Sequence, residues 1–170
     1  MILPYQHNLE GLTDSKKLSE KKREQLAIAI KETAIDWKLA LVTSEEIDRI
    51  NIFQASLLSM KEAVEALDTK PDEVWVDGKF TPELDFSSRA IVGGDALVSS
   101  ISAASIIAKV ARDLMMVELD EQYPGYGFKQ HKGYSTAKHR EALIKLGISD
   151  VHRKSYAPVR KLIEADSILT

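Results

Sequence analysis

The sequence contains no cysteine, so it can hold neither a disulfide framework nor a zinc site built on thiolates. It lacks any apolar run long enough to span a membrane, and its first residues, MILPYQHN, have neither the basic nor the apolar region of a signal peptide. Cytoplasmic residence is therefore the simplest expectation. An excess of positive charge is also absent, since the formal net charge is −3, unlike that of a protein that coats nucleic acid non-specifically. That total leaves room for local basic patches.

Several common catalytic motifs are missing. No serine lies in a G-x-S-x-G elbow, and no Walker A loop is present. We expect His139 and His152 to be surface residues rather than catalytic bases. What remains is an ordinary composition, with 44% hydrophobic and 29% charged residues in a chain of 170. It predicts a single domain over residues 1–170 that buries a sizeable core.

Two short apolar runs each end close to an aspartate. Val74–Val76 leads directly into Asp77, and Ala90–Val92 leads through two glycines to Asp95. Short apolar runs bounded by glycine are typical of buried strands. Acids at the carboxyl ends of neighbouring strands can together bind Mg²⁺ or Mn²⁺, which prefer oxygen ligands. The alternative is that both aspartates are turn residues, since Asp-Gly is a common turn pair.

A long helix is predicted after the second run, beginning at Ser99 or Ser100 and ending near Gln122. Asp113 lies on this helix. It is either a third metal carboxylate or a helix-surface acid paired with a neighbour such as Lys109. We favour the second interpretation.

The other elements follow from capping and breaker signals. Lys38–Val42 is predicted to be a strand, and Thr43 with Glu46 fits a capping box that begins a helical region. That region is expected to break near Asn51. Thr136–Leu146 is predicted to be a short helix that ends at the following glycine.

The sequence contains two basic clusters, of which the first is a candidate phosphate contact. The first lies where a helix is predicted to begin, at Asp14 or Ser15, and comprises Lys16, Lys17, Lys21, Lys22 and Arg23. The second precedes a helix predicted from about Ala157 and comprises His152, Arg153, Lys154 and Ser155. Cations at a helix start oppose the helix dipole, and a bound phosphate would relieve that repulsion. The alternative for the first cluster is an ordinary solvated helix face.

Residues 123–134 are predicted to be a loop in which aromatic and cationic side chains alternate. They are Tyr126, Phe128 and Tyr134, with Lys129, His131 and Lys132 between them. Such alternation suits nucleic acid, because rings stack on bases or sugars while cations contact phosphates. The alternative is a loop whose rings fill the edge of the core, and we expect this of Tyr126 and Phe128.

Six stretches of the chain occur in the order found in ribonucleases HII, and together they cover nearly its whole length. They are DSKKLSEKKR (14–23), VDGK (76–79), GGD (93–95), SAASIIAKVARD (102–113), YGFKQHKGY (126–134) and HRKSYAPV (152–159). The sequence therefore resembles that family. The resemblance implies an α/β fold of the ribonuclease H-like type: a mixed sheet flanked by helices, with a C-terminal helical region.

The resemblance also implies a function. It is cleavage of the RNA strand of RNA–DNA hybrids, and of single ribonucleotides embedded in duplex DNA, in DNA replication and repair. Mn²⁺ or Mg²⁺ would be the cofactor, held by Asp77 and Asp95, which match the family's metal acids. The positions implied to contact nucleic acid are Lys16, Lys17, Tyr134, Arg153 and Ser155. The protein is expected to be a monomer.

The family's first motif, a DEAGRG-like run on the first strand, is not found in this sequence. In the family it supplies an Asp, a Glu and the loop that reads the ribonucleotide. We therefore expect this chain alone to be marginally stable and to have little or no nuclease activity. One alternative is a non-catalytic nucleic-acid-binding fragment. A phosphatase-like metal hydrolase built on the same two acids is another, although the phosphate clusters and the KGY loop argue against a small substrate.

Overall fold

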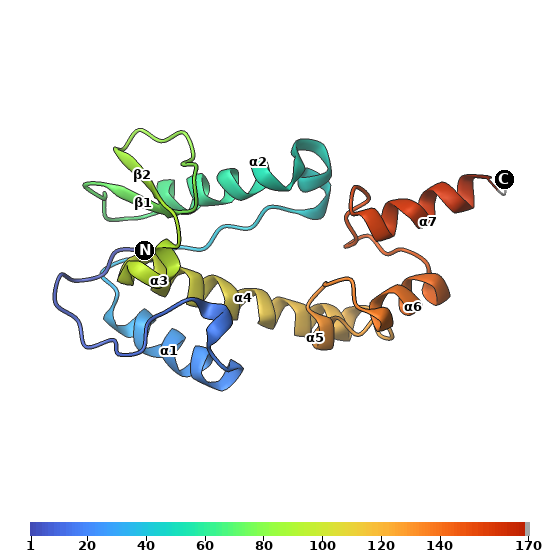
Figure 1. The fold of residues 1–170 in the computed structure, drawn as a ribbon, viewed down its shortest axis with the longest axis horizontal. Helices are drawn as coiled ribbons and strands as arrows, with labels where there is room; N and C mark the ends of the chain where they lie inside the picture. Colours follow the sequence, from blue (N-terminus) through green and yellow to red (C-terminus); the bar gives the residue numbers. More distant parts are fainter. Residues whose placement is uncertain (169–170) are drawn as a thin grey trace. The chain divides into compact units, whose positions relative to one another are not determined.

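Helices make up most of the regular structure in the computed structural model, which describes residues 1–168 (Figure 1). In chain order the elements are the 3₁₀ helix η1 (Ser15–Lys17), α1 (Glu20–Thr33), α2 (Ser44–Glu65), β1 (Val74–Asp77), β2 (Ser88–Ile91), α3 (Gly94–Leu97), α4 (Ser99–Gln122), α5 (Phe128–His131), α6 (Ala137–Leu146) and α7 (Ala157–Ile168). No helix within the described range is long and apolar enough to cross a membrane.

The chain divides into two units. Unit 1 comprises Met1–Leu41 and Leu57–Ala111, and unit 2 comprises Val42–Ser56 and Arg112–Thr170. Helices α2 and α4 each contribute residues to both units. The expectation of a single domain over the whole chain stays a prediction.

Two parallel strands form the sheet of unit 1. Val74 pairs with Ser88 and Asp77 pairs with Ile91, so both strands end at the same edge. The two apolar runs are strands, as predicted, although the second begins at Ser88 rather than at Ala90. The sheet is parallel within the described residues, whereas a mixed sheet was expected.

The predicted strand at Lys38–Val42 is wrong, because these residues form no ladder within the described part of the chain. The nearest pairing is an isolated antiparallel bridge between Ile2 and Asp36. An apolar pattern makes a strand only where a second backbone lies alongside it to complete the hydrogen bonds. Lys38–Val42 has no such neighbour here.

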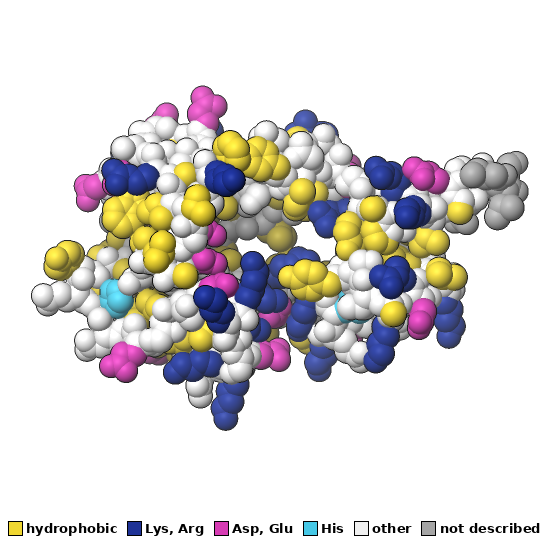
Figure 2. Space-filling view, in the orientation of Figure 1, with side chains coloured by type: hydrophobic (Ala, Val, Ile, Leu, Met, Phe, Trp, Pro, Cys, Tyr) yellow, Lys and Arg dark blue, Asp and Glu magenta, His cyan; other side chains and the backbone are white. Residues whose placement is uncertain are grey.

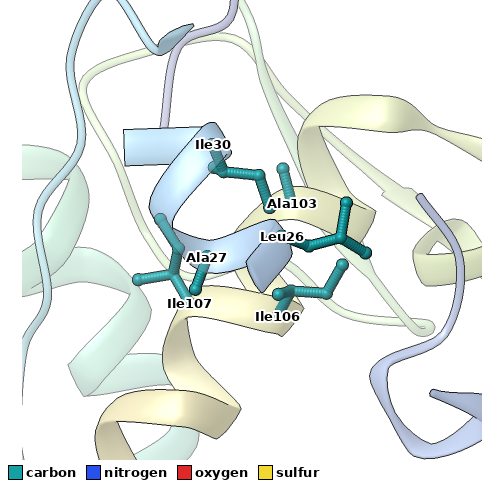
Figure 3. Packing of buried hydrophobic residues seen from close by; sticks show 6 residues of the cluster. All are labelled: Leu26, Ala27, Ile30, Ala103, Ile106 and Ile107. Carbon is teal, nitrogen blue, oxygen red and sulfur yellow. The ribbon is translucent and has the colours of Figure 1, made fainter. Parts of the chain in front are cut away.

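The core of unit 1 lies between α1 and α4 (Figure 3). Its buried residues are Leu26, Ala27 and Ile30 from α1 with Ala103, Ile106 and Ile107 from α4. The small alanine on each helix lets the two backbones approach while the isoleucines fill the space beside them. Helix α4 has the bounds that the sequence predicts, Ser99–Gln122.

The start of α1 differs from the prediction of one helix from Asp14 or Ser15. Asp14 caps only η1, where its carboxylate accepts a hydrogen bond from the backbone N–H of Lys16 at 2.9 Å. Leu18 is then extended, and Ser19 caps α1 by accepting from the N–H of Lys22 at 3.3 Å. A second capping residue five positions after the first therefore begins a new helix.

The capping and breaking signals in α2 are both confirmed. Thr43 Oγ1 accepts a hydrogen bond from the N–H of Glu46 at 3.2 Å, as expected for a helix cap. Asn51 interrupts the helix with φ of 70° and ψ of 164°. Its side-chain oxygen accepts from the N–H groups of Phe53 and Gln54, so asparagine both breaks the helix and caps the part that follows.

The core of unit 2 gathers residues from α4, α5, α6 and α7. They are Met116, Tyr126, Phe128, Leu143 and Val159. Tyr126 and Phe128 stack with ring centroids 5.3 Å apart, which confirms that these two rings fill the core. Phe128 lies on the four-residue helix α5, within the segment that was predicted to be a loop throughout.

Candidate active site

The two candidate metal ligands lie at the carboxyl edge of the sheet. Asp77 is the last residue of β1, and Asp95 lies in α3, the short helix that follows β2. The N–H of Gly94 donates a hydrogen bond to Asp77 Oδ1 at 2.8 Å, which ties the two segments together and orients the carboxylate. A Cβ at Gly94 would lie 2.7 Å from Ile101 Cδ1, so any larger residue here would require the end of the Ile101 side chain to shift.

Asp95 is held from the other side by α4. The hydroxyl of Ser102 donates to the backbone oxygen of Asp95 at 2.5 Å and also lies 3.1 Å from that of Val98. Ser102 is buried. The end of α3 is therefore fixed to the first turn of α4, so the position of Asp95 depends on packing rather than on a free loop.

Both carboxylates line one groove in unit 1, with a volume of about 1030 Å³. Its walls come from the segments near Met1 and Trp37, the second half of α2, strand β1 and the first half of α4. Asp77 is exposed and Asp95 is half-buried. The groove brings the two predicted ligands to one surface, and it is large enough to admit more than water.

The chemistry of this pair suits a hard divalent cation. Mg²⁺ is commonly bound by one or two carboxylates, with water and substrate phosphate completing its shell. The second oxygen of Asp77 and the carboxylate of Asp95 would be the protein donors. Within residues 1–168, no group of three or more His, Asp or Glu side chains is placed to hold a metal ion. The residues present therefore fit a metal site in which the protein supplies two ligands, and water or substrate supplies the others.

Asp113 gives no support to the interpretation as a third ligand, because no such three-residue group occurs in the described range. It is 8% exposed on α4. Its backbone oxygen accepts a hydrogen bond from Lys132 Nζ at 3.4 Å. The pairing of its carboxylate with a neighbour such as Lys109 stays a prediction, and Asp113 is buried rather than on the helix surface as we expected.

Lys16 and Lys17 are exposed on a segment that is itself firmly held. Ser15, 4% exposed, accepts a hydrogen bond at its hydroxyl from Ser105 Oγ on α4 at 3.0 Å. Arg23 donates to the backbone oxygens of Ser15 and Leu18 at 3.1 and 2.6 Å. Arg23 thus stabilises the backbone of this segment. Lys16 and Lys17 are exposed on that fixed backbone.

Tyr134 has an exposed ring, with 65% of its surface accessible. It follows a tight turn in which Lys132 has φ of 51° and Gly133 has φ of 83°. A left-handed conformation is unfavourable for lysine, so other contacts must hold this turn. The backbone N–H of Tyr134 donates to the oxygen of His131 at 2.8 Å, and Arg112 Nη2 lies 3.4 Å from the oxygen of Lys132.

Arg153 and Ser155 surround a carboxylate that the sequence did not single out. Asp48, on the first half of α2, accepts hydrogen bonds from the backbone N–H of Lys154 at 2.6 Å and of Ser155 at 2.9 Å, and from the hydroxyl of Ser155 at 2.5 Å. Arg153 packs over the ring of Tyr156, 5.0 Å from its centroid. Both donors of Ser155 are therefore engaged by an internal anion.

The electrostatics around Asp48 agree with that geometry. Burial on its own would raise the pKa of the carboxyl, but the hydrogen bonds from Ser155 and Lys154, with the nearby charge of Arg153, lower it below its usual value. Asp48 is therefore ionised at neutral pH. The predicted phosphate contact of Ser155 stays a prediction, and it would require Asp48 to give up this position.

The expectation that His139 and His152 are surface residues is wrong, since they are 2% and 8% exposed. His131, predicted as a cation of the loop, is also buried, at 7%. The rings of His131 and His139 stack with centroids 4.1 Å apart, and His139 Nε2 lies 3.2 Å from His152 Nε2. Phe128 contacts all three rings. Burial beside other imidazoles disfavours charge on His139 and His152.

The stability of the protein is expected to fall in mild acid because of these rings. Burial, reinforced by the charge of His139, lowers the pKa of His152 from 6.5 to about 4, and burial also lowers the pKa of His139. His152 therefore takes up a proton near pH 6.5 in the unfolded chain, but only near pH 4 in the folded chain. The contribution of His152 is complete above pH 6.5, and on the order of 3 kcal/mol is lost as the pH falls through that window.

Urea unfolding at several values between pH 7.5 and pH 4, chosen to bracket both pKa values, measures this loss. His152→Gln should be less stable at pH 7 but should show a flatter pH dependence. His7→Ala, which alters the fourth histidine of the chain in unit 1, is the control and should leave the profile unchanged. An equally steep profile in His152→Gln would contradict the assignment of the acid loss to His152.

Some of these missed residues had a signal in the sequence. His139 lies four residues before Leu143, so the two share one face of α6, and Leu143 is a natural core residue. Asp48 had no comparable signal, because its partner Ser155 is 107 positions away in the chain. Ser15 and Ser105 are 90 positions apart and meet only in the fold.

Comparison with known proteins identifies the relatives of this chain. A family model described as "Ribonuclease HII" matches residues 5–159. The ribonuclease HII of Desulforamulus reducens is 54% identical over 162 residues, which cover 95% of this chain and 82% of the relative. That of Dichelobacter nodosus is 54% identical over 164 residues, which cover 96% and 87%.

A solved structure gives the same relationship at the level of the fold. The crystal structure of the ribonuclease H2 from Pyrococcus horikoshii OT3 matches with a TM-score of 0.79 and 28% sequence identity. The match covers 91% of this chain and 81% of that chain. The α/β fold of the ribonuclease H-like type, which the six motifs implied, is confirmed by this likeness.

Proposed function

The chain belongs to the ribonuclease HII family of endoribonucleases, and from that premise we propose that it cleaves the RNA strand of RNA–DNA hybrids and single ribonucleotides embedded in duplex DNA. The observation that carries the proposal is the position of Asp77 and Asp95, which line one groove at the carboxyl edge of two parallel strands. A groove with two carboxylates at a sheet edge is suited to metal-assisted hydrolysis of a phosphodiester.

The roles of the protein groups follow from their contacts. Asp77 is oriented by the N–H of Gly94, so its second oxygen can face a cation, and Asp95 is held by Ser102 and α4. These two would be the protein ligands of Mn²⁺ or Mg²⁺. Such an ion, when bound, supplies a water of lowered pKa and stabilises the leaving oxygen of an in-line displacement. The fixed backbone around both acids keeps them in place without reorganisation at the moment of reaction.

Contacts to the nucleic acid are proposed in both units. In unit 1, Lys16 and Lys17 project from the anchored η1 segment and would bind phosphates. In unit 2, Tyr134 would pack on the sugar beside the ribonucleotide, and Arg153 would contact backbone phosphate. Figure 2 displays Lys and Arg side chains over the surface of the region that carries α5 and α6, in keeping with such a role.

The test is cleavage of a labelled DNA duplex that contains one ribonucleotide, with Mn²⁺ or Mg²⁺ as the only divalent ion. The proposal expects a single product end at the ribonucleotide and none in an all-DNA duplex or in the presence of a chelator. Cleavage of both duplexes, or cleavage that persists after chelation, would contradict it. An assay with a small phosphomonoester separates this function from that of a phosphatase-like hydrolase.

A second candidate function is binding without cleavage. It is favoured by the observation that no group of three or more metal-binding side chains occurs in the described residues, although Asp72 and Glu73 line the groove as well as Asp77 and Asp95. The same duplex distinguishes the two functions. Retention of the labelled duplex without product in Mn²⁺ supports the binding function, and product formation supports the nuclease.

Binding to duplex should weaken as salt rises, because it rests on a few cations that displace counterions from phosphate. Lys16→Ala and Arg153→Ala should each lower affinity about fivefold, roughly 1 kcal/mol, for all sequences alike, and each should reduce the salt slope by about 0.9. Lys61→Ala is the control, since Lys61 lies 3.7 Å from Glu65 on α2 and is not implied to bind phosphate. Fluorescence anisotropy at several salt concentrations measures both quantities. Unchanged affinity and slope in both variants would exclude this surface.

A further inference from the structure

Three buried histidines of unit 2 take no part in the proposed chemistry, yet both nitrogens of every ring have a hydrogen-bond partner. His131 lies on α5, His139 on α6, and His152 in the segment before α7. No buried side-chain nitrogen or oxygen in the described residues lacks a partner. Because a neutral imidazole has one donor and one acceptor, the partners decide where each hydrogen lies.

Ser149 fixes the first end of a directed chain. Its backbone N–H donates to His152 Nδ1 at 3.0 Å, so that nitrogen carries no hydrogen. The hydrogen of His152 is then on Nε2, which donates to His139 Nε2 at 3.2 Å. His139 in turn donates from Nδ1 to the backbone oxygen of Tyr134 at 3.0 Å. The hydrogen-bond chain therefore runs from Ser149 through the two neutral rings of His152 and His139 to the backbone oxygen of Tyr134.

His131 holds the same turn from its other side. Its Nδ1 accepts the N–H of Gly133 at 3.2 Å, so its hydrogen lies on Nε2 and is donated to the oxygen of Tyr126 at 2.8 Å. Its ring stacks on that of His139 with an interplanar angle of 12°. The strained turn at Lys132 and Gly133 is thus bounded by two stacked rings that contact its backbone.

We propose that His139 and His152 are positioning residues, which hold the Tyr134 turn in place for nucleic acid through a hydrogen-bond chain of two neutral rings. The inference deepens the proposed function, on which it rests for the contact of Tyr134 with the sugar. The side chain of Tyr134 makes no contribution to the chain, since only its backbone oxygen accepts. His139 would therefore act through the backbone position of Tyr134 and not on the substrate itself.

The chain requires both rings to be neutral. A proton on His152 Nδ1 would face the N–H of Ser149, and a proton on His139 Nε2 would face the N–H of His152. The other titratable groups packed against them are His131 of α5 and Tyr126, whose ring centroid lies 5.0 Å from that of His152 and whose pKa is raised by burial, so that it too is neutral, while Met116 of α4 and Val159 of α7 bring no charge. The cations Arg112 and Lys132 are directed to the backbone oxygens of Lys132 and Asp113. In the described residues no carboxylate is hydrogen-bonded to the three rings, and for His139 burial outweighs the hydrogen bond to the backbone oxygen of Tyr134, which alone would favour the charged form.

Nuclear magnetic resonance of the ¹⁵N-histidine-labelled protein tests the chain without nucleic acid. At neutral pH the inference expects hydrogen on Nε2 of His152 and His131 and on Nδ1 of His139, with no change of tautomer on titration to pH 6. His7, which lies in unit 1, supplies a separate histidine signal for assignment. An Nδ1 hydrogen on His152, or a charged His139 at neutral pH, would overturn the proposal.

Two substitutions of His139 test its effect on the turn. His139→Asn places an amide nitrogen near the position of Nδ1 and can still donate to Tyr134, whereas His139→Leu cannot. His139→Leu should increase amide hydrogen exchange at Tyr134 and Thr136 and weaken duplex binding about tenfold, and His139→Asn should recover most of both. Equal behaviour of the two variants, or unchanged exchange in His139→Leu, would overturn it.

Tyr134→Ala separates this inference from the proposed function. If that variant binds duplex as tightly as the wild type, Tyr134 does not contact the sugar. The hydrogen-bond chain then has no role in nucleic-acid binding. A second outcome is that Tyr134→Ala weakens binding, whereas His139→Leu is folded like the wild type and binds equally well. The sugar contact of Tyr134 is then supported, and the positioning role of His139 is contradicted. Weakened binding in both, with recovery in His139→Asn, supports the inference.

Discussion

Asp77→Asn is expected to lower metal-dependent cleavage on the order of 10³-fold in any form of the protein that is active, because several kcal/mol of charge stabilisation are lost with the ligand. The fold should be unaffected. Asparagine has nearly the shape of aspartate, and its side-chain oxygen can still accept the hydrogen bond from the N–H of Gly94, which is 2.8 Å from Asp77 Oδ1. The substitution therefore removes a negative charge from the groove and leaves the link between β1 and α3 intact.

Two readouts make this expectation independent of the level of activity. Cleavage of the single-ribonucleotide duplex reports catalysis, and titration of Mn²⁺ by electron paramagnetic resonance reports binding of the ion. The second should show an affinity lowered at least about tenfold, since a carboxylate ligand of a hard cation is replaced by an amide. Asp85→Asn is the matched control, because Asp85 is an exposed acid of unit 1 that does not line the groove. Equal Mn²⁺ affinity in Asp77→Asn and Asp85→Asn would remove Asp77 from the site.

Local patterns in the sequence were sufficient for the two strands that lead to the acids, but not for α3, the short helix that carries Asp95. The apolar runs ending at Asp77 and near Asp95 are strands β1 and β2, and parallel pairing brings their ends to one edge, as Asp77 opposite Ile91 illustrates. Capping signals located the start of α2 and its break at Asn51. Each of these features depends on residues within a few positions, which is the range over which sequence patterns carry information.

Features that depend on distant partners could not be predicted in the same way. Lys38–Val42 has a strand-like composition, but strands also need a neighbouring backbone, and none pairs with it in the described residues. In the sequence Asp48 resembles an ordinary helix-surface acid, because its partner Ser155 is distant in the chain. His139 shares the buried face of α6 with Leu143, but its burial also depends on the rings of His131 and His152 from other segments of the chain.

Ile106→Ala is expected to lower the free energy of unfolding by about 3 to 4 kcal/mol, within the range for isoleucine in a close-packed core. Ile106 is fully buried between α1 and α4, in contact with the cluster that includes Leu26 and Ile30 (Figure 3). For a domain of ordinary stability, roughly 5 to 15 kcal/mol, this loss removes a large fraction of the total. If the chain is as marginally stable as its sequence suggests, the variant should be substantially unfolded at 37 °C. Chemical denaturation monitored by far-ultraviolet circular dichroism measures the change, with exposed Leu114→Ala on the same helix as the control.

The same variant tests whether the two units unfold together. Helix α4 supplies Ile106 to the core of unit 1 and Met116 to the core of unit 2, and it is continuous between them. Loss of one core should therefore unwind a helix that the other core requires, so we expect a single cooperative transition, as predicted for one domain. Hydrogen exchange should show weaker protection in α6 of Ile106→Ala as well as in α1, and Leu143→Ala should have the reciprocal effect on α1. Protection that falls only in the unit that carries the substitution would mean that each unit is a separate folding domain.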